Sequence, residues 1–147
     1  MKLSTRVRYG TRALLDLALH AGGATVPLKE IAERQDISLQ YLEHLVAPLI
    51  SAGILNSVRG PRGGIKLMRR PEEVKLSELY DLLEGGQVPV DCLRDSSACP
   101  RYDFCVTRDV WQEVDEAIQN VLGGTTMADL VTRHKTRAGG EAINYSI

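Results

Sequence analysis

The sequence predicts a mainly α-helical protein with one small β-hairpin. Apolar residues recur at three- and four-residue steps near the N-terminus and again in a long stretch after residue 105, which is the spacing of amphipathic helices. Between these stretches, two short helical segments are followed by two short apolar segments that flank a Gly/Pro-rich turn, the pattern of a hairpin. A chain of 147 residues can form one compact domain, or a small domain with an accessory element.

The first predicted helix covers residues 4–21 and ends at Gly22-Gly23, because glycine commonly follows the last helical turn. Its apolar residues fall on one face, which consists of Val7, Ala13, Leu14, Leu17 and Ala18. We expect that face to receive the helices that follow.

Two shorter helices are predicted over residues 28–34 and 38–52, joined by a three-residue turn. Ser38 is a natural N-cap for the second helix, because its hydroxyl can accept hydrogen bonds from backbone N–H groups. Pro48 falls inside that helix and can kink it or end it early. Two short helices with such a turn form a helix-turn-helix, although a helical hairpin without any ligand has the same pattern.

Residues 54–58 and 64–68 are predicted strands of a hairpin whose tip carries Arg59 and Arg62. A hairpin directly after a helix-turn-helix is a wing. Arginines beside glycines suit close approach to a phosphate backbone or to a narrow minor groove, whereas an ordinary exposed hairpin would also be polar and Gly-rich. Together these segments predict a winged helix-turn-helix DNA-binding domain over residues 1–71.

Charge is distributed unevenly along the chain. Residues 1–70 hold eleven Lys/Arg and five Asp/Glu, whereas residues 71–147 hold seven Lys/Arg and fourteen Asp/Glu. A basic half next to an acidic half favours one part that binds a polyanion and a second part with another task. The alternative explanation of the imbalance is random scatter of surface charge.

Residues 72–104 are predicted to form a linking helix and a cysteine loop. Ser77 is expected as the N-cap of that helix, which covers residues 77–83, and turn-forming residues dominate the loop. Residues 105–135 are predicted to form a long dimerisation helix and a short terminal helix that ends at His134. Thr125-Thr126 can cap the terminal helix, and residues 136–147 are expected to be a flexible tail.

The long helix has a wide apolar stripe that needs a partner surface. Its members recur every four residues: Val106, Val110, Val114, Ile118 and Leu122, with Trp111, Ala117 and Val121 beside them. A second copy of the chain is the economical partner, which predicts a two-fold dimer packed helix against helix. The alternative is packing on the chain's own first helix.

Several classes of protein are disfavoured. No apolar run approaches the ~20 residues that span a bilayer, and the N-terminal charges precede no apolar stretch like that of a signal peptide. We therefore expect a cytoplasmic protein. There is also no nucleophile with a base at a recognisable spacing and no phosphate-cradling glycine loop, so we expect no enzyme.

Cys92, Cys99 and Cys105 lie within fourteen residues and are the only cysteines in the chain. An odd number in a cytoplasmic protein argues against a disulfide framework. Thiolates are soft ligands for iron–sulfur clusters and for zinc, and the spacing here is wider than that of structural zinc knuckles. The cysteines therefore favour an iron–sulfur cluster over zinc, with a reduced, metal-free loop as the alternative.

The chain resembles the IscR/NsrR/CymR family of bacterial regulators. Residues 26–35 and 37–43 resemble the family's helix-turn-helix, and residues 57–64, Ser-Val-Arg-Gly-Pro-Arg-Gly-Gly, resemble its wing. The three spaced cysteines, followed by Trp111 on a long helix, resemble the cluster loop and dimerisation helix of the cluster-binding members. The resemblance covers residues 1–135 and is strongest to the iron–sulfur cluster regulators of the IscR type.

The resemblance implies a homodimer that binds a palindromic operator on double-stranded DNA. It also implies an iron–sulfur cluster, [2Fe–2S] in preference to [4Fe–4S], whose binding or loss changes DNA binding. By position, Ser38, Gln40 and Tyr41 match the part of the recognition helix that contacts bases and backbone. Glu43 matches an acidic residue involved in choosing between DNA sequences, and Arg59 matches the wing arginine.

The sequence departs from the family pattern at the fourth cluster ligand. IscR has a histidine three residues after the third cysteine, and here that position is Arg108. Some relatives use an acidic residue or histidine near the N-terminus of the partner's first helix, where this chain has no acid before Asp16. An arginine cannot deprotonate to become a ligand, but it could offset cluster charge or replace metal altogether. The fourth ligand stays open, with these candidates: Asp109, Asp103, Glu84, His44, a partner-chain group or an exogenous ligand.

Two alternative functions follow from the same features. One is a cluster-free regulator of the CymR type that acts through a protein partner. The other is a thiol redox or metal-carrier protein whose basic half is incidental. Iron analysis and spectroscopy test the first alternative, and operator binding tests the second.

Overall fold

The computed structural model describes residues 3–86 and 88–144, with the backbone alone for residues 140–144. Its helices are α1 (Thr5–His20), α2 (Leu28–Gln35), α3 (Leu39–Ser51), α4 (Leu76–Glu84), α5 (Val106–Gly123) and α6 (Met127–Asn144). The strands β1 (Leu55–Val58) and β2 (Gly64–Leu67) form an antiparallel hairpin. This arrangement confirms the predicted fold class of mainly α structure with a small hairpin. None of the helices in the described ranges is long and apolar enough to cross a membrane.

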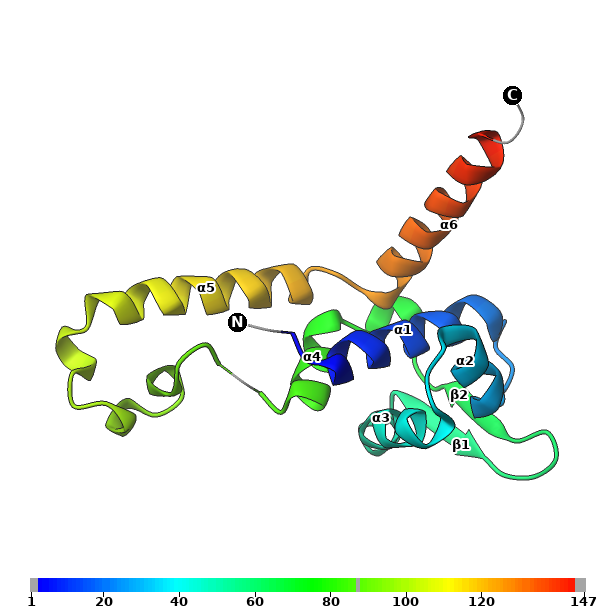
Figure 1. Cartoon of the computed structure of the whole chain (residues 1–147), viewed down its shortest axis with the longest axis horizontal. Helices are drawn as coiled ribbons and strands as arrows, with labels where there is room; N and C mark the ends of the chain where they lie inside the picture. The colour runs from blue at the N-terminus through cyan, green and yellow to red at the C-terminus, as the bar shows by residue number, and fades with distance from the viewer. Residues whose placement is uncertain (1–2, 87, 145–147) are drawn as a thin grey trace.

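The hydrophobic core is built around α1, which contacts α2, α3, α4 and α6 (Figure 1). Leu14 and Leu17 of α1 are almost fully buried, as are Ile31 of α2 and Leu42 of α3. The apolar face predicted for the first helix therefore organises the helix-turn-helix, because α2 and α3 both pack on this face of α1.

Local capping explains where α1 and α3 begin. The Ser4 hydroxyl accepts a hydrogen bond from the Val7 N–H at 3.3 Å, and the Ser38 hydroxyl accepts one from the Tyr41 N–H at 3.2 Å. The second bond confirms Ser38 as the predicted N-cap. α3 continues beyond Pro48 to Ser51, so this proline does not end the helix early.

The hairpin is joined to the segment that precedes α2. The Val26 N–H donates to the Ile65 carbonyl and the Ile65 N–H donates to the Val26 carbonyl, both at 2.9 Å. The backbones approach so closely here that a Cβ at Gly64 would collide with the Val26 carbonyl, which explains a glycine at this position. The base of the wing is therefore fixed to the helix-turn-helix.

The predicted N-cap of α4 was wrong. α4 begins at Leu76, and Lys75 rather than Ser77 occupies the N-cap position. Lys75 is held in an extended conformation by a bridge to Thr126, and the Leu76 N–H donates to the Thr125 carbonyl at 2.9 Å. A contact with the distant start of α6, which no local pattern indicates, therefore sets the start of this helix.

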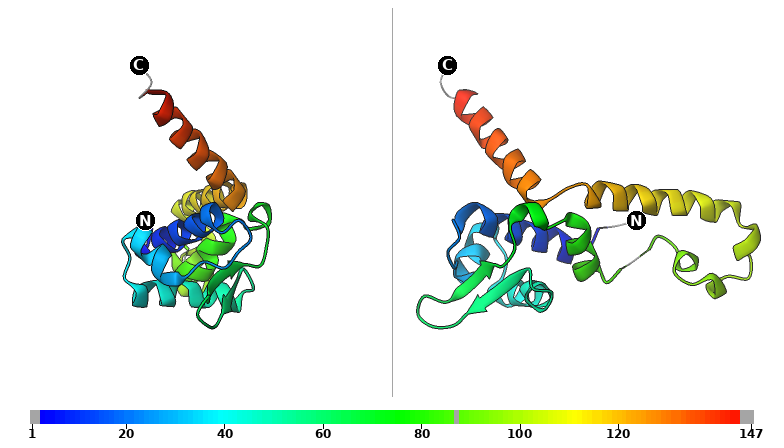
Figure 2. Two further views of the ribbon diagram at one scale, coloured as in Figure 1. Left: turned by 90° about the vertical axis from the view of Figure 1, so that its right-hand side faces the viewer. Right: turned by 180° about the vertical axis from the view of Figure 1, so that it is seen from behind.

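The last two helices leave the compact part of the molecule in different directions (Figures 1 and 2). α6 starts with the fully buried Met127, and Thr126 and Asp129 cap each other's backbone N–H groups, which confirms the predicted cap. The prediction that this helix ends at His134 was wrong, because it continues to Asn144. Each glycine inside a helix costs only about 1 kcal/mol, so the glycines at 139–140 do not stop it. The predicted tail is thus helical as far as residue 144, and its residues 145–147 lie outside the described residues.

Candidate nucleic-acid interface and cysteine loop

The N-terminal half of α3 presents polar side chains on the surface. Ser38, Gln40 and Glu43 are exposed, whereas Leu42, Leu45 and Leu49 are buried in the core. The packing of α3 therefore leaves the predicted contact residues at the outer face of the helix-turn-helix. The Ser38 hydroxyl already accepts the capping hydrogen bond, although it can still donate its own proton.

Tyr41 is half-buried, unlike its exposed neighbours Ser38 and Gln40. Its hydroxyl donates to the Thr5 hydroxyl at 3.3 Å. Its ring meets the Tyr9 ring edge-on, with the two centroids 6.2 Å apart. Tyr41 thus links the first turn of α3 to α1, and its predicted contact with DNA stays a prediction.

The wing carries two exposed arginines in a tight turn. The Gly63 N–H donates to the Gly60 carbonyl at 2.8 Å, which places Arg59 and Arg62 at and beside the turn. Neither arginine forms an ion pair with any residue that the structure describes. By contrast, Arg69 pairs with Glu78 at 2.7 Å and Arg70 pairs with Glu73 at 3.1 Å. Of these four arginines, the two at the tip are therefore the ones available for an anion.

The hairpin and α3 lie on the side of the molecule opposite to α6 (Figures 1 and 2). A groove of about 290 Å³ separates the C-terminal half of α3 from the hairpin, with Glu43, Val46, Ser57 and Val58 among its lining residues. This side combines an exposed helix face with a cationic hairpin tip, which are the elements of a winged DNA-binding surface.

The cysteine loop projects from the compact domain and leads into the far end of α5 (Figure 1). It contains three short 3₁₀ turns: η2 (Asp91–Leu93), η3 (Ser96–Ala98) and η4 (Tyr102–Phe104). Cys92, Cys99 and Cys105 are half-buried free thiols. Within residues 3–86 and 88–144, no three His, Cys, Asp or Glu side chains converge as a metal site would require. In this conformation the loop therefore does not bring the predicted ligands together.

Cys105 is the cysteine with the most distinct environment. It occupies the N-cap position of α5, and its Sγ lies 3.2 Å from the Thr107 Oγ1. The hydrogen bond with the Thr107 side chain lowers the pKa of the Cys105 thiol, and the backbone N–H of Arg108 lowers it further. Since the thiolate is the form that binds soft metals, the chemistry of this donor fits an iron–sulfur cluster.

Comparison with known proteins assigns the chain to a family. A family model called Rrf2, described as an iron-dependent transcriptional regulator, matches residues 3–133. The chain belongs to the Rrf2 family. Rrf2 proteins are transcriptional regulators that bind DNA, and this confirms the prediction that the chain is not an enzyme.

Individual Rrf2 relatives agree with this assignment. Protein rrf2 of Nitratidesulfovibrio vulgaris is 42% identical over 131 residues, which are 89% of this chain and 87% of the relative. The structure of T. potens IscR is 40% identical with a TM-score of 0.75, over 91% of this chain and 88% of that one. The structure of CymR (YrzC), described as the global cysteine regulator of B. subtilis, is 34% identical with a TM-score of 0.76, over 90% and 98% of the two chains. These relatives confirm the family resemblance drawn from the sequence.

Arg108 stands at the position where the resemblance to IscR places a histidine ligand. Its guanidinium donates to the Tyr102 carbonyl at 3.0 Å and to Asp109 at 3.2 Å, and it lies 4.2 Å from the centroid of the Tyr102 ring. Its Nε is buried and has no hydrogen-bond partner among the described residues. The side chain thus joins the end of the cysteine loop to the start of α5, and its neighbour Asp109 is engaged by it.

The other candidates for a fourth ligand are dispersed. Glu84 of α4 accepts a hydrogen bond from the Ser4 hydroxyl. His44 lies on α3 within the winged domain, and Asp103 is exposed in η4. In this conformation none of them joins the cysteines.

α5 has the exposed apolar face that the sequence predicted. Val110, Trp111 and Val121 are between 44% and 67% exposed, and a hollow of about 420 Å³ is lined by Val114, Ala117, Ile118, Val121 and Leu122. α5 packs mainly on α4, so most of its stripe is left uncovered by the residues that the structure describes.

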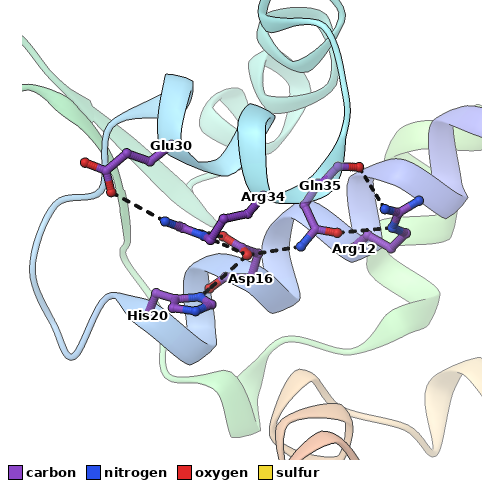
Figure 3. Close-up of polar contacts among 6 residues, drawn as sticks. All are labelled: Arg12, Asp16, His20, Glu30, Arg34 and Gln35. Atoms are coloured by element: carbon purple, nitrogen blue, oxygen red, sulfur yellow. Dashed lines mark hydrogen bonds and ion pairs between the residues drawn. The ribbon is translucent and has the colours of Figure 1, made fainter.

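A polar cluster between α1 and α2 was missed by the sequence analysis. The buried carboxylate of Asp16 binds Arg34 and Gln35, the last two residues of α2 (Figure 3). One signal was present, because Asp16 interrupts the apolar stripe of the first helix between Ala13 and Leu17. A charged residue on a buried helix face needs a partner, but its identity depends on the tertiary fold.

Proposed function

We propose that this Rrf2 protein is a homodimer that binds a palindromic operator and senses iron–sulfur cluster status, iron or redox signals through its cysteine loop. The observation that carries the proposal is the placement of the cysteines. They lie on a segment that leads directly into α5, the helix with an uncovered apolar face, while the winged domain stands at the other end of the chain's fold. The loop also joins α5 to α4, and α4 packs on α1 and α3 of the winged domain, so a change in the loop can act on both the dimer and the DNA-binding surface.

On the DNA, the first turns of α3 enter the major groove. Ser38, Gln40 and Tyr41 contact bases and backbone, and Glu43 discriminates between sequences. Arg59 and Arg62 bind the minor groove or neighbouring phosphates. Their lack of ion-pair partners in the described part of the chain supports this role, because a guanidinium already paired would gain less from a phosphate.

In the dimer, two copies of α5 cover each other's apolar stripes. An isologous two-fold interface doubles the winged domain, and two identical readers favour a palindromic site. The wholly apolar lining of the hollow on α5 supports this partner, since a surface of this kind is stabilised by burial against a like surface.

Cys92, Cys99 and Cys105 would hold the cluster, [2Fe–2S] in preference to [4Fe–4S], and when bound it would supply a redox-active centre. The lowered pKa of the Cys105 thiol favours a thiolate at the start of α5. The fourth ligand is one of the candidates named above or a small molecule. Coupling between the loop and the DNA-binding surface would be worth about 1–3 kcal/mol.

A second candidate is a cluster-free regulator of the CymR type that responds through a protein partner. Two observations favour it: Arg108 clamps the loop to α5 with a side chain that cannot ligate metal, and the cysteines do not converge in this conformation. A remote third possibility, a thiol redox or metal-carrier protein, predicts thiol exchange without DNA binding.

Iron and sulfide analysis of anaerobically purified protein, with absorption and electron paramagnetic resonance spectra, separates the candidates. We expect stoichiometric iron and sulfide in the wild type, a loss of both in Cys92→Ala, and a changed spectrum in Asp109→Ala if Asp109 is a ligand. Colourless, iron-free protein after reconstitution would favour the cluster-free regulator. DNA binding is tested separately with the same preparations, on a duplex that the wild-type protein enriches from a random pool.

A further inference from the structure

Asp16 is the one acidic side chain that is buried in the part of the chain the structure describes, with 3% of its surface exposed. Its carboxylate accepts hydrogen bonds from the Arg34 Nη2 at 2.7 Å and from the Arg34 Nε at 3.0 Å. The Gln35 side-chain amide donates a further bond at 3.0 Å. His20, one turn along α1, lies 3.5 Å from the same carboxylate (Figure 3). These partners compensate a charge that would be costly to bury alone.

The polar cluster around Asp16 holds the C-terminal end of α2. Arg34 and Gln35 are its last two residues. Arg12 of α1 donates to the Gln35 backbone carbonyl at 2.8 Å and to its side-chain carbonyl at 3.1 Å. Asp16 and Arg12 therefore bind this helix end through both side chains and main chain, as Figure 3 shows.

The turn of the helix-turn-helix starts immediately afterwards. Asp36 is the one non-glycine residue with a positive φ, 52°, among the described residues, and the N-cap Ser38 opens α3 two residues later. On the far side of the turn, Tyr41 is tied to α1 through Thr5 and Tyr9. α1 thus holds the chain both before and after a turn that is only three residues long.

We propose that Asp16 and Arg12 are positioning residues for α3. They act through Arg34 and Gln35 to fix where the turn begins, and hence the direction in which the first turn of α3 meets the major groove. Neither residue needs to touch DNA for this role. The inference rests on the proposed function, because it takes α3 to be the recognition helix.

The test compares two duplex probes: the sequence that the wild-type protein enriches from a random pool, and a scrambled duplex of the same composition. For Asp16→Asn and Arg12→Gln, we expect affinity for the enriched duplex to fall by about tenfold or more, the loss of one good base contact. Affinity for the scrambled duplex, which depends on phosphates, should change no more than in the controls. A purely stabilising role would leave the ratio of the two affinities unchanged in folded protein.

Two controls match the charge changes. Glu33→Gln removes an exposed carboxylate from α2, and Arg133→Gln removes an exposed guanidinium from α6, on the side away from the hairpin. Circular dichroism establishes that each variant is folded at the assay temperature. If Asp16→Asn does not fold, Arg12→Gln decides the question. Arg12 is exposed, and its removal leaves no buried charge without a partner.

The outcomes separate the two proposals. If wild type enriches a duplex and folded Arg12→Gln and Asp16→Asn keep its preference, the positioning role is wrong while DNA binding by the protein stands. If wild type enriches no duplex, the proposed function itself fails.

Discussion

The Arg108 guanidinium lies over the Tyr102 ring, 4.2 Å from its centroid, and donates to the carbonyl of the same residue at 3.0 Å. The ring and the backbone carbonyl of Tyr102 thus attach the last turn of the cysteine loop to the first turn of α5. We expect this attachment to restrain Cys105, which lies between the two residues in the sequence.

Replacing Arg108 should loosen the loop. A partly exposed cation–π contact contributes about 1 kcal/mol, so in Arg108→Ala we expect backbone amides of residues 99–108 to exchange hydrogen about fivefold faster. Mass spectrometry of reduced, metal-free protein measures this. Arg101→Ala removes an exposed arginine from the same loop and should leave the exchange rates unchanged. Equal rates in all three proteins would show that the stacking does not restrain the loop.

Removing Arg34 should destabilise the winged domain. Arg34→Met leaves Asp16 buried without its main partner, which costs about 3 kcal/mol, the lower end for a broken buried pair, because Arg34 itself is 32% exposed and Gln35 still donates. Urea denaturation measures the free energy of unfolding. The matched change is Glu30→Gln, which breaks only the exposed pair at 3.4 Å and should cost less than about 0.5 kcal/mol.

The same pair predicts a dependence of stability on acid. Burial alone raises the pKa of Asp16, but hydrogen bonds from Arg34 and Gln35 outweigh it and hold that pKa below its ordinary value. A depressed pKa stabilises the folded state fully above the unfolded value of about 4. That contribution is lost as pH falls through the lower, folded value. The difference in free energy of unfolding between wild type and Asp16→Asn should therefore shrink as the pH falls below about 4. A difference that grows below pH 4 would contradict the assignment.

The apolar face of α5 predicts the oligomeric state. Ile118→Glu places a charge among the residues that line the hollow, so we expect sedimentation equilibrium to show a monomer where the wild type is a dimer. Glu113→Gln changes an exposed polar position of the same helix and should stay dimeric. A wild-type monomer, or a dimeric Ile118→Glu variant, would exclude this face as the interface.

The wing arginines predict a change in the salt dependence of DNA binding. Each phosphate contact contributes about 0.9 to the slope of log affinity against log salt, so Arg59→Ala and Arg62→Ala should each reduce that slope by about one. Arg70→Ala serves as the control, because Arg70 is already paired with Glu73. Slopes equal to that of the wild type would place the wing away from the phosphates.

Features that depend on short-range physics were predicted well. Ser38 as a cap, the hairpin with its arginine tip and the stripe of α5 all follow from local patterns. The start of α4 was missed because it depends on a bridge between Lys75 and Thr126. The partners of Asp16 were missed for the same reason, since α1 and α2 meet only in the folded chain. The three thiols show the converse, because closeness in sequence did not make their side chains converge.

The paired hydrogen bonds between Val26 and Ile65 have a consequence for sequence choice. They fix the base of the hairpin beside the start of α2, which limits how far the tip can move relative to α3. Any mismatch with a given duplex that exceeds this range has to be absorbed by bending or groove narrowing in the DNA. Base steps that deform easily should therefore be preferred between the two contact points, even where no side chain reaches them.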